Sequence, residues 1–381
     1  MNYNKYDVII VGCGFFGSVI AERIATQMNL KVLIIDKRNH IGGNCYSEIH
    51  KETNVNYHKY GTHIFHTSNQ KVWNYISNFA EFNNYKHQVL TTFKDRVYQM
   101  PINLETINSF YNVNLKPFEV KDFLKSEIDK ENISSEPRNF EEKAISLIGR
   151  PLYEAFIKGY TLKQWQRHPS KMPESILNRL PFRTNYDETY FLNAKWEGIP
   201  IGGYTPIFEK LLDHQNIDIR LNTDFFEIKK DLPNDKILFY SGPIDKFFDY
   251  KHGKLDWRTL HFEKEVVDYN DFQGTSVMNY ADENIPFTRI HEPKHLHPEE
   301  ENTLPNTLII KEFSLKDDGS NPYYPISDDR NQKIVLKYRK EVSKVDNLFI
   351  CGRLGDYKYY DMDKTIEMAL ETFDKFNYNH K

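Results

Sequence analysis

The chain has 381 residues, with 50 basic and 54 acidic side chains and a formal net charge of −4. This length predicts two or three domains, because one hydrophobic core rarely grows beyond about 250–300 residues. The near balance of charge gives no general attraction to nucleic acid or to a membrane surface. The three cysteines are odd in number and far apart, which favours a reduced, cytoplasmic protein. The first residues show no signal-peptide pattern and no run long enough to span a bilayer.

The first predicted elements are a strand, a tight turn, a helix and a second strand between Tyr6 and Asp36. Residues 8–11 and 32–35 are continuous runs of valine, isoleucine and leucine, typical of strands buried on both faces. The segment between them has apolar residues at helical spacing after the turn. This order predicts the first half of a nucleotide-binding fold.

The turn has the pattern GxGxxG. Glycine at Gly12 and Gly14 lets the backbone approach a pyrophosphate, and Gly17 allows the helix to pack on the strand. The helix N-terminus supplies free N–H groups, and Asp36 is placed to accept hydrogen bonds from an adenosine ribose. No second GxGxxG occurs, so the sequence predicts a site for one dinucleotide.

Further along the chain, Gly42 and Gly43 indicate either a second close approach to the cofactor or a simple turn. His63 and His66 are three residues apart. Without acidic or cysteine ligands at suitable spacing, they favour a place beside the cofactor over a metal site.

The middle of the chain changes pattern. We expect a helix over residues 71–84, a hairpin over 89–101 with its turn at 94–96, and a helical insertion over about 104–160. Residues 237–248, 255–267, 276–280 and 287–290 are expected to be strands of an antiparallel sheet. Residues 291–298, rich in histidine, proline and charge, are interpreted as a solvated loop, not a metal site.

A proline-bounded segment follows the helical insertion. It carries Lys171, Arg179 and Arg183 beside aromatic residues. Two interpretations stay open for it: a mobile lid over an anionic ligand, or an ordinary connection. At the end of the chain, residues 348–353 predict a strand that ends in glycine, and residues from 362 predict a helix. The two ends of the chain are therefore expected to meet in one nucleotide-binding domain.

Ten ordered motifs carry a resemblance over almost the whole chain. The chain resembles bacterial UDP-galactopyranose mutases through GCGFFG, DKRNHIGGN, YGTHIFHT, SLIGRPLYEAFIKGYTLKQW, NRLPFR, GIPIGGYT, YSGPID, NIPFTRIHE, PYYPI and GRLGDYKYYDMD. The resemblance implies an α/β fold in three parts: a discontinuous Rossmann-like FAD-binding domain (1–77, 200–242 and 345–381), a helical domain with a mobile substrate loop (103–180), and an antiparallel β-sheet domain (78–102, 181–199 and 243–344).

The resemblance also implies an activity. The family interconverts UDP-galactopyranose and UDP-galactofuranose with FAD in its reduced form, through an adduct between flavin N5 and the sugar and without net redox change. A cytoplasmic homodimer with a role in cell-surface polysaccharide biosynthesis, without nucleic-acid or membrane partners, is implied as well. The alternatives are a flavin-dependent amine oxidase and a non-catalytic flavoprotein that binds sugar nucleotides.

Matching the motifs residue by residue implies three groups of site residues. The catalytic group is Arg179, Arg289, His63 and His66. The substrate group is Phe156, Tyr160, Trp165, Tyr190, Asn279, Tyr324, Tyr359 and Asp361. The cofactor group is Gly12, Gly14, Phe16, Gly17, Asp36, Lys37, Gly43, Asn44, Gly61, Thr62, Arg353, Asp361 and Met362, and no metal is implied.

One position departs from the family pattern. Thr62 stands where the family often has proline or alanine, on the sugar side of the flavin. The expected substrate is UDP-galactose, with UDP-N-acetylgalactosamine as an additional or alternative substrate.

Overall fold

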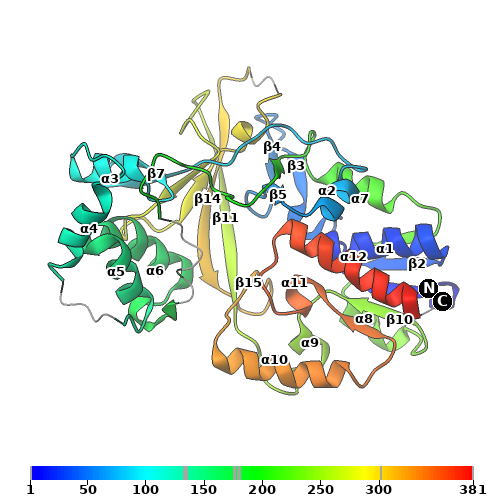
Figure 1. Cartoon of the computed structure of the whole chain (residues 1–381). Coiled ribbons are helices and arrows are strands. Elements are labelled where there is room, and N and C mark those ends of the chain that lie inside the picture. Colours follow the sequence, from blue (N-terminus) through cyan, green and yellow to red (C-terminus); the bar gives the residue numbers. More distant parts are fainter. Residues whose placement is uncertain (1, 132–135, 175–176, 178–181, 301–302, 380–381) are drawn as a thin grey trace.

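The computed structural model describes residues 2–131, 136–174, 177, 182–300 and 303–379. A parallel sheet with its helices, a long twisted sheet and a group of helices follow one another across the molecule (Figure 1). Both ends of the chain lie in the part built on the parallel sheet, away from the helical group. Among the described residues, no helix is both long and apolar enough to cross a membrane.

The parallel sheet joins segments that are far apart in the sequence. In the described chain it has five strands in the order β16-β10-β1-β2-β9, every neighbouring pair parallel. Their bounds are β1 Val8–Val11, β2 Val32–Ile35, β9 Ile217–Arg220, β10 Ile237–Tyr240 and β16 Leu348–Ile350. The strands expected at 8–11 and 32–35 are confirmed. The expected meeting of the two ends of the chain is also confirmed, because β1 and β16 both pair with β10.

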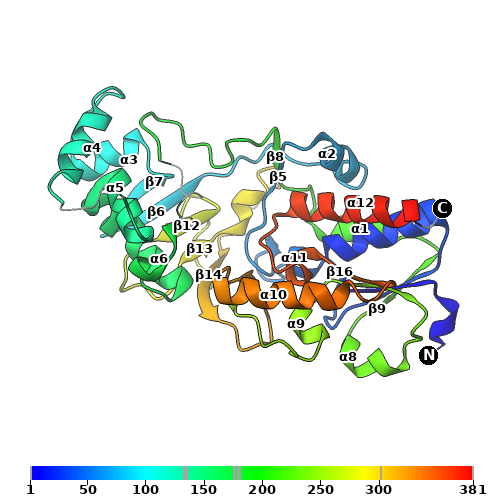
Figure 2. The same ribbon diagram turned by 60° about the horizontal axis from the view of Figure 1, so that its bottom comes forward.

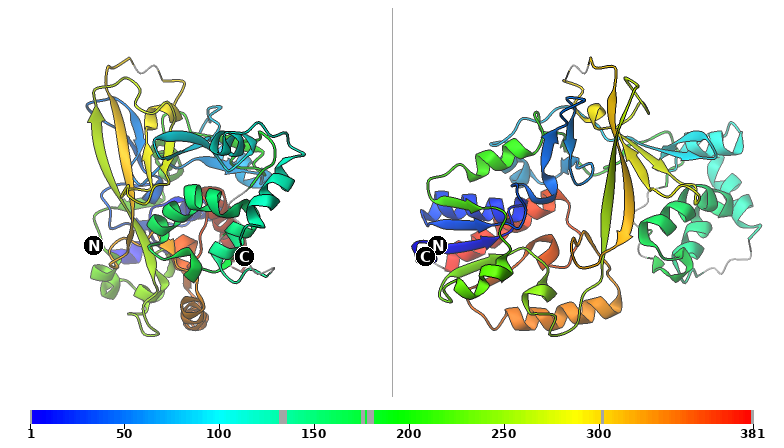
Figure 3. Two further views of the ribbon diagram at one scale, coloured as in Figure 1. Left: turned by 90° about the vertical axis from the view of Figure 1, so that its left-hand side faces the viewer. Right: turned by 180° about the vertical axis from the view of Figure 1, so that it is seen from behind.

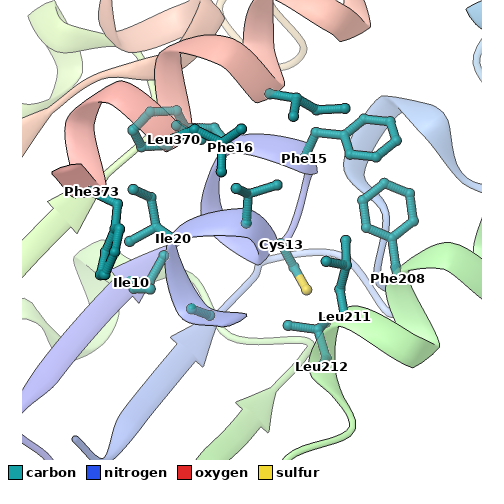
Figure 4. Packing of buried hydrophobic residues seen from close by; sticks show 14 of the residues in the cluster. Ile10, Cys13, Phe15, Phe16, Ile20, Phe208, Leu211, Leu212, Leu370 and Phe373 are labelled. Atoms are coloured by element: carbon teal, nitrogen blue, oxygen red, sulfur yellow. The ribbon is translucent and has the colours of Figure 1, made fainter. Parts of the chain in front are cut away.

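Successive side chains of a strand point to opposite faces of the sheet, and here both faces carry apolar side chains, so each face has its own core. Val8, Ile10, Val32 and Ile34 face α1 (Phe15–Arg23), α7 (Thr205–Leu212) and α12 (Met362–Asn379). Figure 4 shows α1 between the other two helices, with Phe15 toward Phe208 and Ile20 near Phe373. The opposite face is covered by α8 (Phe225–Ile228), α9 (Ile244–Phe247) and α10 (Asp329–Val342) (Figure 2).

A second sheet forms the middle of the molecule. Its seven strands within the described residues have the order β15-β11-β14-β13-β12-β6-β7. Their bounds are β6 Val89–Phe93, β7 Arg96–Met100, β11 Trp257–Val267, β12 Val277–Tyr280, β13 Arg289–His291, β14 Thr307–Lys316 and β15 Tyr324–Pro325. The hairpin expected over 89–101 is confirmed. The sheet is antiparallel except for one parallel pair, β6 with β12.

The strand expected over residues 237–248 is wrong in its extent and its sheet. β10 ends at Tyr240 and belongs to the parallel sheet, and residues 244–247 form α9. The reason is local: Ser241-Gly242-Pro243 interrupts the apolar run, and proline cannot donate a ladder hydrogen bond.

The helical insertion is confirmed. It contains α3 Leu104–Tyr111, α4 Val120–Ile128, α5 Phe140–Leu152 and α6 Gly159–Trp165, which lie together at one end of the molecule (Figure 3). These helices share one apolar core with β7. The helix expected over 71–84 is shorter, α2 Gln70–Ile76. Two small sheets connect these parts. One pairs β3 Ser47–Ile49 with β4 Asn56–His58, and the other pairs β5 Phe65–Thr67 with β8 Trp196–Gly198.

The interpretation of residues 291–298 as a solvated loop is wrong. Glu292, Leu296 and His297 are at most 1% exposed, and residues 293–296 form a turn of 3₁₀ helix. The Glu292 carboxylate accepts hydrogen bonds from the backbone N–H groups of Phe272 and Gln273, which explains its burial. The three domain boundaries stay a prediction. α10, placed in the sheet domain by that prediction, packs against β10 and β16 of the parallel sheet.

Candidate active site

A cavity of about 430 Å³ lies where the carboxyl ends of the parallel strands meet the twisted sheet. Val11, Ile35 and Tyr240 end three parallel strands on its wall, and Arg289 and Glu312 face it from β13 and β14. In open α/β sheets, ligands bind outside the carboxyl ends of the strands. This position makes the cavity the candidate active site.

The glycine turn between β1 and α1 forms one end of the cavity. Gly12 has φ +103°, a conformation that favours glycine, and a Cβ there would meet Ser241 Oγ at 2.1 Å. A Cβ on Gly17 would lie 2.0 Å from the Gly12 carbonyl oxygen, so Gly17 permits the packing of α1 on β1 as expected. Gly14 and Gly43 come together at the cavity, since a Cβ on Gly43 would lie 3.0 Å from Gly14 Cα.

Asp36 is fixed at the end of β2. Its carboxylate accepts the backbone N–H of Cys13 at 2.8 Å and that of Arg38 at 2.9 Å. These bonds link the second strand to the glycine turn and hold the carboxylate at the cavity wall. The remaining lone pairs of Asp36 are available for ribose hydroxyls.

These residues fit a dinucleotide cofactor. The N-cap of α1, Gly14, has no side chain to satisfy the first N–H groups of the helix, and these groups suit a pyrophosphate. Across the cavity, α11 (Gly352–Gly355) and the start of α12 supply Arg353 and Met362. The buried Nε of Arg353 has no hydrogen-bond partner among the described residues, and an anionic ligand would satisfy it.

The two predicted histidines lie on one side of the cavity. His63 Nδ1 is 2.7 Å from the Gly61 carbonyl oxygen, which can only accept, so Nδ1 donates and Nε2 presents a lone pair. Burial lowers the pKa of His63 to about 4, which keeps this imidazole neutral at pH 7. His66 is stacked under Phe191 with ring centroids 3.7 Å apart, and its Nε2 lies 3.9 Å from an Asp361 carboxylate oxygen.

Another part of the cavity wall is cationic and rich in tyrosine. The Arg353 guanidinium lies 4.9, 5.0 and 5.1 Å from the ring centroids of Tyr323, Tyr324 and Tyr359. Burial raises the pKa of Tyr324 well above its ordinary value, so its hydroxyl keeps its proton as a donor. Arg289 donates from Nη2 to the Tyr160 hydroxyl, and its Nε lies 3.5 Å from Glu312 Oε1.

Most of the predicted residues come together on this cavity. Those on its wall are Gly12, Gly14, Phe16, Asp36, Lys37, Gly43, Asn44, Gly61, Thr62, His63, His66, Tyr190, Arg289, Tyr324, Arg353, Tyr359, Asp361 and Met362. Their individual roles stay predictions.

Five predicted residues are not on the cavity wall. Gly17 lies under the turn, and Phe156 is in the core of the helical group, where it contacts Phe93, Tyr98 and Phe110. Trp165 packs on the same core. Tyr160 reaches the site only through Arg289, and Asn279 is the direct cross-strand partner of Arg289 on β12. Arg179 lies outside the described residues.

Sequence reasoning missed Phe191, His87, Tyr323 and Glu312, which also line the cavity. Burial and the nearby Arg289 lower the pKa of His87 to about 3, so it is a second neutral histidine. The signal for Glu312 was available: it is an acid in the apolar run of β14, and a buried acid requires a partner.

One cluster of acidic and histidine side chains lies outside the cavity. Asp271, Glu292 and His295 are a group of described residues that could hold a metal ion. The Lys294 ammonium lies 3.9 Å from Asp271 and 3.8 Å from Glu292, where it balances the same carboxylates.

Comparisons with known proteins give a consistent result. A family model described as UDP-galactopyranose mutase matches residues 155–359, and one described as an NAD(P)-binding Rossmann-like domain matches residues 10–79. A probable UDP-galactopyranose mutase of Klebsiella pneumoniae is 44% identical over 98% of this chain and 95% of its own. A dTDP-fucopyranose mutase of Escherichia coli is 41% identical over 98% and 99%.

Solved structures extend the comparison to the fold. A reduced UDP-galactopyranose mutase superimposes with a TM-score of 0.72 at 12% identity, covering 98% of this chain and 94% of that one. A putrescine oxidase bound to putrescine has a TM-score of 0.53 at 11% identity, with coverage of 98% and 99%. At these identities the likeness concerns the fold alone.

Proposed function

Because the chain belongs to the UDP-galactopyranose mutase family, we propose that it interconverts UDP-galactopyranose and UDP-galactofuranose with FAD as cofactor. The observation that carries the proposal is a single cavity whose wall holds both the dinucleotide turn with Arg353 and a second group of Arg289, Tyr324 and Tyr359. A dinucleotide cofactor and a substrate diphosphate thus have adjoining places in one site.

FAD would be held by the α1 N-terminus, Asp36 and Arg353, and when reduced it supplies a nucleophilic nitrogen for the anomeric carbon. The protein side chains have a different task. Negative charge grows on the diphosphate as the bond to the sugar breaks, and Arg289 with the hydroxyls of Tyr324 and Tyr359 can hold that charge. Neutral His63 offers a hydrogen-bond acceptor without adding a second cation to the sugar side.

The amine oxidase alternative shares this fold, as the putrescine oxidase comparison illustrates. Arg289 argues against it, because a fixed guanidinium in the cavity repels an ammonium substrate. A non-catalytic binding protein would not need the Arg289–Glu312 pair in the cofactor cavity, since burying the Glu312 carboxylate is costly.

Two further substrates have specific support. The Escherichia coli relative acts on dTDP-fucopyranose by its name, and it covers this chain as fully as the Klebsiella relative does. Thr62, which departs from the family pattern, lies on the cavity wall. We therefore retain UDP-N-acetylgalactosamine as a proposed additional or alternative substrate. UDP-galactose remains the preferred substrate.

The test uses purified protein, which we expect to be yellow. With dithionite, chromatography should show conversion of UDP-galactofuranose to the pyranose form, and the three sugar nucleotides should be compared side by side. Arg289→Ala should lose about 10²- to 10³-fold in kcat/KM while keeping bound flavin. Arg138→Ala, whose side chain is 81% exposed, is the matched control. Absence of conversion of all three nucleotides by the reduced wild type would overturn the proposal.

Several finer statements remain part of the proposal. We propose a cytoplasmic homodimer whose product serves cell-surface polysaccharide biosynthesis. Arg179 is proposed to act as a second cation at the diphosphate. These statements follow from the family resemblance, and gel filtration with light scattering tests the dimer.

A further inference from the structure

Four side chains, three of them on the cavity wall, form a continuous chain of contacts. Thr62 Oγ1 lies 2.7 Å from His291 Nδ1, and His291 Nε2 lies 3.0 Å from Glu312 Oε2. The other Glu312 oxygen, Oε1, lies 3.5 Å from Nε of Arg289. The chain therefore links Thr62, the neighbour of His63 in the sequence, to Arg289.

Strand register brings three of these residues together. Arg289 and His291 are two positions apart on β13, so their side chains share one face of the sheet. Glu312 is the direct partner of Arg289 on β14, and His291 is its diagonal neighbour. The Thr288 hydroxyl also donates toward Glu312, at 3.3 Å from Oε1.

The turn that carries Thr62 is seated on the same sheet. Gly61 has φ +93°, and a Cβ there would lie 3.0 Å from the Phe262 ring and 3.8 Å from Glu312 Oε2. A side chain at Gly61 would be strained by this φ and would crowd the Phe262 ring. The Thr62 hydroxyl is thus held against His291 by a backbone that cannot move toward the sheet.

Donors and acceptors are matched from Thr62 to Glu312. Burial alone would raise the pKa of Glu312, but Arg289 and the hydrogen bond from His291 lower it to about 2. The ionised carboxylate only accepts, so His291 Nε2 carries the hydrogen in their contact. The neutral tautomer then has a lone pair at Nδ1, which accepts the Thr62 hydroxyl. His291 is 2% exposed and Glu312 is 3% exposed, so water does not compete for these bonds.

We propose that His291 is a positioning residue for Arg289: it fixes the Glu312 carboxylate from the Thr62 side, and the carboxylate holds the guanidinium toward the substrate diphosphate. The proposal rests on the proposed function, since it takes Arg289 as a diphosphate ligand. His291 itself is not on the cavity wall, so it acts through Glu312. Without His291, Oε2 of Glu312 loses its partner, and the carboxylate is held only at Oε1 by Thr288 and Arg289.

The experiment measures UDP binding by calorimetry and steady-state kinetics on the flavin-loaded enzyme. His291→Phe keeps an aromatic ring but removes both nitrogens. His291→Gln keeps one donor and one acceptor, and His261→Phe changes an exposed histidine on β11 as the control. His291→Phe should raise Kd for UDP and KM about tenfold, with kcat changed less than threefold and flavin retained. His291→Gln should restore most of the binding, and the control should match the wild type.

Thr62→Val keeps the test decisive if His291→Phe does not fold. It removes the hydroxyl at the far end of the chain and should raise Kd for UDP about threefold. In the His291→Gln background the same substitution should act non-additively, because both residues act through one carboxylate.

The failure of this inference is distinguishable from failure of the proposed function. If Arg289→Ala weakens UDP binding while His291→Phe and Thr62→Val leave Kd unchanged, the positioning role is refuted and the mutase proposal stands. A loss of thermal stability in His291→Phe with unchanged Kd also refutes it, because that result indicates a structural role only. If the wild type does not bind UDP, the proposed function itself fails.

Discussion

Glu312→Gln tests the electrostatics of the site most directly. Glutamine keeps the size of the side chain and removes its charge, as protonation would. The pKa of Glu312 falls from its ordinary value of 4.5 to about 2, mainly through Arg289 and His291, which overcome the opposing effect of burial. A shift of this size corresponds to about 3 kcal/mol of stability at pH 7, at 1.36 kcal/mol for each pKa unit.

The direction of the Glu312 pKa shift determines how the free energy of unfolding depends on pH. A carboxylate with a lowered pKa in the folded state contributes stability above its unfolded pKa and loses it as pH falls toward the folded pKa. The difference in free energy of unfolding between wild type and Glu312→Gln should be constant above about pH 6 and smaller by about 1 kcal/mol at pH 4. The variant itself should lack this part of the pH dependence.

The assay is urea unfolding followed by tryptophan fluorescence, at pH 7 and pH 4, with midpoints and slopes recorded for both proteins. Glu263→Gln, on β11 with a side chain 57% exposed, is the control and should match the wild type at both pH values. A difference near zero at pH 7 would refute the reasoning, and so would an equal difference at pH 4.

Three further substitutions test other parts of the site. Asp36→Ala removes the acceptor of the Cys13 N–H and the proposed ribose ligand, and should weaken FAD binding at least about tenfold in a flavin-fluorescence titration; unchanged affinity would remove Asp36 from the cofactor site. Gly17→Ala places a Cβ 2.0 Å from the Gly12 carbonyl oxygen and should leave little soluble yellow protein, whereas a normal yield would contradict the close packing of α1 on β1. Phe191→Ala uncovers His66 and should lower kcat/KM about two- to tenfold with FAD retained, while Phe272→Ala, 40% exposed, should have no effect.

The cofactor end of the site was predictable because its information is local. Glycine spacing, two buried strands and Asp36 lie within about thirty residues, and each carries its own physical reason. The same holds for the β6–β7 hairpin, where the turn residues Lys94 and Asp95 have positive φ as a tight turn requires.

The substrate end could be approached only through the family resemblance. Arg289, Glu312 and Phe191 come from separate segments, and their contacts depend on strand register that no single stretch of sequence specifies. Phe156 shows the opposite case. An aromatic residue in a helical pattern serves a core as well as it serves a ligand, and here it lies in the core of the helical group.

The pairing of β1 and β16 with the same strand has a consequence for synthesis of the protein. Residues 348–379 are synthesised after the other four strands of the parallel sheet, yet they supply Arg353, Met362 and the helix that covers Ile20 and Phe16 of α1. Until they emerge, the apolar side of α1 has no complete cover and the cofactor cavity lacks one wall. The nascent chain therefore lacks part of its cofactor site until late in synthesis, while the helical group already has all its residues and can fold during translation.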